Sequence, residues 1–127
     1  MNIPNNLKYT KDHEWVFIKS ENEILCGITD FAQKELGDIV YVDIERVGDV
    51  IEKEEVFGTV EAVKTVSDLF MPISGKVEAF NQELEENPQL INEDPYQNGW
   101  IIKIVDYNES SFDELLSPEQ YQELLGL

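Results

Sequence analysis

The sequence predicts a mainly β protein in which two antiparallel sheets pack against each other and a few short helices are added. Two observations support this fold class. Short runs rich in β-branched and aromatic residues recur along the chain, and glycine, proline and asparagine residues separate them. The chain has 127 residues and shows no linker, low-complexity tract or internal repeat. We therefore expect residues 1–127 to form a single domain.

Seven runs have the composition of β-strands, and turn-forming residues separate them. These runs are residues 7–18, 24–28, 39–44, 56–60, 66–70, 75–80 and 101–105. A polar turn at residues 20–23 would join the first two runs as an antiparallel pair. Many short strands with this punctuation favour two packed sheets over a single open sheet.

Helix-capping signals are found in three places, of which two lie between strand runs. In residues 29–37, Asp30 and Gln33 can form a capping box, and Gly37 can close the last turn. Asn81 can cap a second short helix. Both segments are short, so they predict added helices and not a helical layer of the fold.

The third helix signal lies close to the C-terminus. Ser117 and Gln120 have the spacing of a capping box, Pro118 suits the first turn, and Gly126 can end the helix. One apolar stripe would face the core, and it would consist of Tyr121, Leu124 and Leu125. The sequence thus predicts a C-terminal helix that packs on the sheets.

Acidic residues dominate the charge of the chain. It has 27 acidic and 9 basic residues, which give a formal net charge of −18. This charge repels phosphate backbones and anionic membranes, so we expect neither a nucleic-acid nor a membrane partner. It favours solubility and can steer the chain toward enzymes with basic docking surfaces. No apolar run approaches the ~20 residues of a membrane span, and residues 1–7 lack a signal- or transit-peptide pattern. A cytoplasmic protein is expected.

The chain contains one cysteine and one histidine, which leaves little material for a disulfide framework, a zinc centre or a cysteine–histidine catalytic pair. Cys26 lies in an apolar run and is expected to be a small buried core residue. His13 has no nucleophile near it in the sequence and is expected to make structural hydrogen bonds. The sequence therefore assigns neither a metal ligand nor a catalytic residue.

Residues 58–75 are the most informative stretch of the sequence. Two strand-like runs meet near Lys64, which places this lysine at a turn with its ammonium group in water. A solvated surface lysine is the simplest interpretation of that position. The neighbouring residues change the interpretation, because Glu61 stands three residues before Lys64 and Gly75 stands eleven residues after it.

This segment resembles the lipoyl-attachment segment of the glycine cleavage system H proteins. The resemblance implies a lipoyl group in amide linkage to Lys64, with Glu61 and Gly75 helping the lipoylating enzymes to recognise the hairpin. Three further segments are similar to the family, namely residues 9–16, 27–42 and 92–100. The implied fold is the lipoyl-domain sandwich, or barrel-sandwich hybrid. Gln97 departs from the family, which has a glycine there, and would cost roughly 1 kcal/mol if the backbone required a positive φ.

The resemblance also implies a function. The lipoyl disulfide would accept an aminomethyl group from the pyridoxal-phosphate-dependent glycine decarboxylase and pass it to the tetrahydrofolate-dependent aminomethyltransferase. Dihydrolipoamide dehydrogenase would then reoxidise the dithiol. The chain itself would be a carrier and not an enzyme. Its loaded arm carries a cationic amine, for which a carboxylate beside an apolar cleft is suitable. Glu14 and Asp68 are the candidates, because each lies in a segment that matches the family.

Three alternatives remain open at this point. A biotinyl carrier domain has the same topology, but it usually has methionines on both sides of its lysine, whereas Val63 and Thr65 flank Lys64 here. A lipoyl-relay protein, which supplies lipoate to 2-oxoacid dehydrogenases, would use the same lysine. A small enzyme or a structural β-sandwich would carry no modification, and the mass of the natively made protein would distinguish it.

Overall fold

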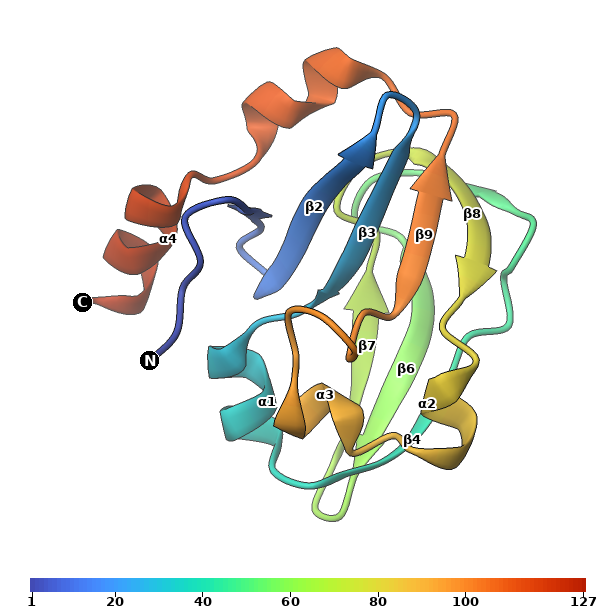
Figure 1. The fold of residues 1–127 in the computed structure, drawn as a ribbon, viewed down its shortest axis with the longest axis vertical. Coiled ribbons are helices and arrows are strands. Elements are labelled where there is room, and N and C mark those ends of the chain that lie inside the picture. The colour runs from blue at the N-terminus through green and yellow to red at the C-terminus, as the bar shows by residue number, and fades with distance from the viewer.

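Two antiparallel sheets of unequal size form the framework of the computed structural model, which describes all 127 residues (Figure 1). The larger sheet contains, in spatial order, β1 (Lys8–Tyr9), β2 (Glu14–Ser20), β3 (Glu23–Ile28), β9 (Ile102–Val105), β8 (Gly75–Phe80) and β5 (Val50–Ile51). The smaller sheet contains β4 (Ile39–Asp43), β6 (Val56–Ala62) and β7 (Val66–Phe70). Every strand pair is antiparallel. This arrangement confirms the mainly β fold class that the sequence predicts.

The main hydrophobic core lies between the two sheets. Side chains of the larger sheet such as Ile24 and Ile104 belong to the same buried cluster as Val60 and Leu69 of the smaller sheet. Ile24 and Ile104 are register partners on neighbouring strands. Cys26 is fully buried in this cluster, as its apolar sequence context predicts. Burial of these apolar side chains is the main contribution that holds the sheets together.

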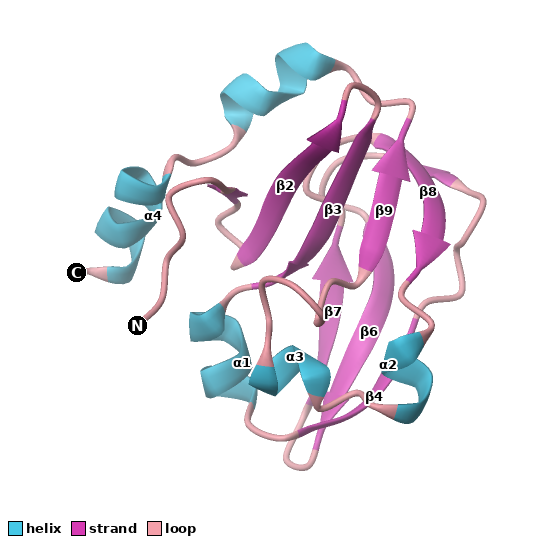
Figure 2. Cartoon of the chain, viewed as in Figure 1, coloured by secondary structure: helices cyan, strands magenta, loops and turns pink.

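Short helices surround the sheets (Figure 2). They are α1 (Asp30–Leu36), α2 (Glu83–Glu86), α3 (Leu90–Glu93), the 3₁₀-helix η1 (Glu109–Glu114) and α4 (Pro118–Leu125). The cap of α1 differs from the predicted one, because the side chain of Thr29 accepts the Ala32 amide while Gln33 bonds the Asp30 carboxylate. No helix has the length and apolar composition that a membrane crossing requires.

The C-terminal helix α4 closes a second, smaller core over the outer edge of the larger sheet (Figure 1). Its capping box forms as predicted, with Ser117 and Gln120 each bonding the other's backbone. Gly126 ends it in the left-handed conformation, at φ 79°. The predicted apolar stripe is only partly correct, because Tyr121 is buried but Leu124 is half exposed.

The first predicted strand is interrupted. Residues 7–18 form two separate strands, β1 and β2, which pair with each other. The interruption lies at His13, whose φ of 65° is in the left-handed region and turns the chain back on itself. Gln97, by contrast, is not among the residues with a positive φ, so its difference from the family glycine requires no strained backbone.

Candidate functional site

Lys64 lies at the tip of the β6–β7 hairpin, in the connection between Ala62 and Val66. The Ala62 amide donates to the Thr65 carbonyl over 2.7 Å and closes the turn. Val63 is 71% exposed, and Lys64 is exposed too and takes part in no ion pair. The tip projects beyond α1 and α3 at the lower end of the view in Figure 1. The amine of Lys64 is thus open to another molecule.

The backbone of the hairpin tip is also tied to the end of α1. The amide of Val63 donates to the carbonyl of Asp38 over 3.1 Å. Asp38 directly follows Gly37, the C-cap of α1. The position of Lys64 relative to α1 is therefore set by a backbone hydrogen bond as well as by sheet pairing.

Glu61 and Gly75 occupy different environments. Glu61 is an exposed residue of β6, in register with Tyr41 of β4 and Val66 of β7. Gly75 begins β8 in the other sheet, beyond the end of β7 that is remote from Lys64. The structure brings Glu61 close to the hairpin tip in register, but it does not bring Gly75 there.

Close packing gives Gly75 a second constraint. A Cβ atom at this position would lie 2.7 Å from Cγ2 of Ile104 and 3.0 Å from the Val105 carbonyl oxygen. Gly75 does not have a positive φ. The position requires glycine for space and not for backbone freedom.

Two hollows follow α1 away from the hairpin tip. The first, of about 320 Å³, is called the Lys64 hollow here, and it is lined by Lys34, Glu35, Leu36, Gly37, Asp38, Val63 and Lys64. The second, of about 310 Å³, is called the Glu14 hollow, and its lining includes His13, Glu14, Phe31, Ala32, Leu36 and Asp68. Glu35 and Leu36 line both hollows. The two hollows therefore adjoin along α1, and together they are called the surface path between Lys64 and Glu14 here.

Glu14 is a buried carboxyl group at the inner end of this path, with only 2% of its surface exposed. Its Oε2 accepts the Phe70 amide over 2.8 Å, and its Oε1 lies 3.3 Å from the Thr10 hydroxyl. Burial raises the pKa of Glu14 to about 8, although both hydrogen bonds act in the opposite direction. Glu14 is not the ordinary solvated carboxylate that its sequence context allows.

Asp68 reaches the same hollow from the opposite sheet. It lies on β7, in register with Thr59 of β6, and its side chain is exposed. Glu14 lies on β2 of the larger sheet. The two carboxyl groups proposed from sequence are thus brought to one hollow by strands of different sheets, more than fifty residues apart in the chain.

His13 is the lining residue that sequence reasoning assigned only to structural hydrogen bonding. Its Nδ1 lies 2.9 Å from the hydroxyl group of Tyr121, which agrees with that assignment, but the ring also lines the Glu14 hollow. Burial lowers the pKa of His13, while Asp12 and Glu35 act in the opposite direction. The imidazole is therefore mainly neutral at pH 7.

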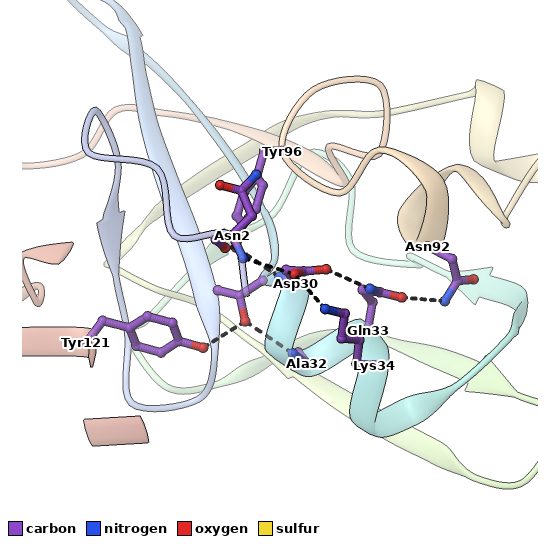
Figure 3. Close-up of polar contacts among 9 residues, drawn as sticks. Asn2, Asp30, Ala32, Gln33, Lys34, Asn92, Tyr96 and Tyr121 are labelled. Atoms are coloured by element: carbon purple, nitrogen blue, oxygen red, sulfur yellow. Dashed lines mark hydrogen bonds and ion pairs between the residues drawn. The ribbon is translucent and has the colours of Figure 1, made fainter. Parts of the chain in front are cut away.

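Hydrogen bonds from distant segments fix α1 as one wall of both hollows (Figure 3). The Asp30 carboxylate accepts the backbone amide of Asn2 over 3.2 Å. The Asn92 amide group donates to the Gln33 side chain and to the Gly37 carbonyl, both over 2.9 Å. The role of Glu35 and Leu36 as shared lining was not foreseen, because no local pattern in residues 29–37 shows which helix face meets the hairpin.

The chain is similar to known proteins over almost its whole length. The family model described as Glycine cleavage H-protein matches residues 7–126. A glycine cleavage system H protein from Carboxydothermus hydrogenoformans is 54% identical over 123 residues, which cover 97% of this chain and 94% of that protein. One from Bacillus cereus is 53% identical over 125 residues, which cover 98% and 97%.

A solved structure agrees with these similarities. The crystal structure of a glycine cleavage system H protein from Mycobacterium marinum has a TM-score of 0.86 and 35% sequence identity to this chain. The match covers 98% of this chain and all of the other. From the family model, the relatives and the shared fold, we conclude that this chain belongs to the glycine cleavage H-protein family.

Proposed function

We propose that this chain is the lipoyl carrier of the glycine cleavage system, with a lipoyl group in amide linkage to Lys64. The observation that carries the proposal is an unpaired, exposed lysine at a hairpin tip, beside a surface path that ends at a buried carboxyl group. The chain acts as a non-catalytic cytoplasmic carrier, a single lipoyl-binding domain that partner enzymes act upon. Amide formation at Nζ removes the lysine charge and leaves a long flexible tether.

When attached, the lipoyl group supplies a disulfide that takes up the aminomethyl group at the glycine decarboxylase, yields it at the aminomethyltransferase and is reoxidised by dihydrolipoamide dehydrogenase. The residues of the path are suitable for this group. Leu36, Phe31 and Ala32 offer apolar surface along α1 to the tether and ring. Glu14 and Asp68 offer carboxylate oxygens to a cationic amine at the far end.

The energies favour binding of that cationic amine by Glu14. With a pKa of about 8, ionising Glu14 at pH 7 costs about 1.4 kcal/mol. A charge-assisted hydrogen bond contributes about 1.5–3 kcal/mol, which matches or exceeds that cost. Asp68 adds a second, exposed acceptor whose contribution is smaller because water screens it. Glu14 and Asp68 would thus retain the amine in the hollow.

Glu61 and Gly75 serve recognition by the lipoylating enzymes in this proposal. Glu61 presents its carboxylate in a row with Tyr41 and Val66, one strand position from the hairpin connection. Gly75 acts less directly, because it lets β8 lie close to β9 in the larger sheet. The lipoylating enzymes would contact Glu61 directly, whereas Gly75 would preserve the packing of the fold that they recognise.

Intact-mass measurement of the natively made protein tests the attachment site. We expect the wild type to exceed its sequence mass by one lipoyl group, and Lys64→Arg to lack this increment because Arg offers no acylatable amine. Lys19→Arg, at the exposed end of β2, is the matched control and should keep the increment. An increment that survives in Lys64→Arg would contradict the assignment.

Release of ammonia from the loaded protein tests the two carboxyl groups. The lipoylated protein is loaded with glycine and decarboxylase, the enzyme is removed, and ammonia is followed with time. Replacing a charge-assisted hydrogen bond by a neutral one in Glu14→Gln should speed release by roughly five- to tenfold. Asp68→Asn should speed it less, because water screens this exposed group. Glu21→Gln, in the β2–β3 turn at the other end of β2, should match the wild type. Equal rates in all four proteins would leave Glu14 and Asp68 as bystanders.

A further inference from the structure

The hydroxyl group of Tyr121 joins three segments next to His13, a lining residue of the Glu14 hollow. Tyr121 lies on α4 and is fully buried. Its Oη lies 2.7 Å from Oγ1 of Thr29 and 2.9 Å from Nδ1 of His13. Figure 3 shows the tyrosine ring directed toward the first turn of α1. One phenol therefore links the C-terminal helix, to which it belongs, with the turn before β2 and the start of α1.

Both partners of this hydroxyl group also position the hollow. Thr29 is the N-cap of α1 and accepts the Ala32 amide over 3.2 Å. Its own backbone amide donates to the His13 carbonyl over 3.0 Å. The His13 ring lies 4.7 Å from the ring of Phe31, centre to centre. His13, Phe31 and Ala32 all line the Glu14 hollow, so a shift of Tyr121 would be transmitted to that lining.

The single proton of the Tyr121 hydroxyl group limits the hydrogen bonds that the His13 imidazole can make with it. A tyrosine hydroxyl has one proton to donate and faces two partners. Either Tyr121 donates to His13 Nδ1, so that the ring proton lies on Nε2, or Nδ1–H donates to Tyr121 and the phenol donates to Thr29. In both cases the hydroxyl group is the partner of Nδ1. Nε2 is therefore the ring nitrogen that this hydroxyl group leaves free, whichever tautomer is present.

We propose that Tyr121 is a positioning residue for the arm-binding hollow: its hydroxyl group couples α4 to His13 and Thr29 and, by engaging Nδ1, fixes the orientation of the His13 imidazole. The part that concerns the arm rests on the function proposed above. The coupling itself concerns only this chain and can be tested on unmodified protein. The C-terminal helix is then part of the machinery that holds the arm, although none of its residues lines the hollow.

Tyr121→Phe and Tyr9→Phe form a matched pair of variants. Tyr9 is also fully buried, and its ring stacks on that of Tyr121 at 4.7 Å. Its hydroxyl group donates to the Pro4 carbonyl over 2.7 Å and does not touch the hollow. Each variant removes one buried phenol hydroxyl and keeps the ring, so general destabilisation should be similar in the two. Urea unfolding of both variants checks that similarity.

The first readout is the imidazole itself. The chain has one histidine, so long-range ¹H–¹⁵N spectra contain a single set of ring signals. In unmodified protein, Tyr121→Phe should shift the Nδ1 signal and change the tautomer populations, because Nδ1 loses its partner. Tyr9→Phe should leave both as in the wild type. The charged groups beside this ring, Asp12 and Glu35, are the same in all three proteins. Unchanged ring signals in Tyr121→Phe would refute the coupling.

The second readout is retention of the one-carbon unit on loaded, lipoylated protein. Loss of one neutral hydrogen bond that orders the hollow should speed ammonia release by about three- to tenfold in Tyr121→Phe. Tyr9→Phe should release at the wild-type rate. Equal release rates in both variants would overturn the positioning role even if the ring signals respond. Failure of the wild type to become loaded would instead refute the proposed function, and the spectra would still decide the coupling.

Discussion

At the scale of single residues, Gly75 and Glu61 are under different physical constraints, although both are spaced from Lys64 as in the family motif. Gly75 is confined by Ile104 and by the Val105 carbonyl, and a backbone oxygen cannot move aside without disturbing the β8–β9 pairing. Glu61 is exposed on the smaller sheet and makes no ion pair. Packing therefore restricts the first position, whereas no ion pair within the chain involves the second.

This difference predicts opposite phenotypes for two alanine variants. Gly75→Ala should lower the free energy of unfolding by about 1–3 kcal/mol, because the added Cβ overpacks the core. Glu61→Ala should change it by no more than about ±0.5 kcal/mol but should slow lipoylation by the lipoylating enzymes. Urea unfolding and the rate of mass increase measure the two effects. Wild-type stability of Gly75→Ala, or wild-type lipoylation of Glu61→Ala, would contradict the respective assignment.

At the scale of elements, the strands and the capped C-terminal helix could be predicted from local chemistry. Short apolar runs specify β3 and β9, and Ser117, Pro118 and Gln120 specify the start of α4 without any tertiary contact. The division between β1 and β2 could not be predicted. It depends on the positive φ of His13, which the β-favouring composition of residues 7–18 does not indicate.

The candidate site could be predicted only in part from sequence, for a related reason. Lys64 and Glu61 are identified by spacing along one hairpin, which is a local property. The Glu14 hollow is assembled from β2 and the turn before it, β3, α1, β6 and β7, and the Tyr121 contact comes from α4, more than ninety residues from Thr29. Sequence similarity suggested Glu14 and Asp68, but neither the burial of Glu14 nor the part of Tyr121 follows from any local pattern.

At the scale of the whole molecule, Glu14 connects the two sheets as well as lining the hollow. Its carboxyl group lies on β2 of the larger sheet and accepts the amide hydrogen of Phe70 on β7 of the smaller sheet. Its burial raises its pKa from 4.5 to about 8, so the folded protein retains a proton that the unfolded chain releases. The stability of the whole fold is thereby linked to pH through one side chain.

The sign of this linkage determines how the stability of the fold changes with pH. A carboxyl group whose pKa is higher in the folded state stabilises fully below its unfolded value, near pH 4.5, and this contribution is lost as pH rises through about 8. Between these limits the free energy of unfolding should fall by about 1.4 kcal/mol per pH unit on account of Glu14. Glu14→Gln keeps an acceptor for the Phe70 amide but cannot ionise, so it should lack this contribution. Urea unfolding of both proteins at pH 5, 6, 7 and 8 should therefore show the wild type losing stability relative to the variant at each step. Parallel pH profiles would mean that Glu14 is already ionised in the folded protein over this pH range. Glu14 would then be a carboxylate at pH 7 that can accept a cation directly, and not the protonated group that its burial indicates.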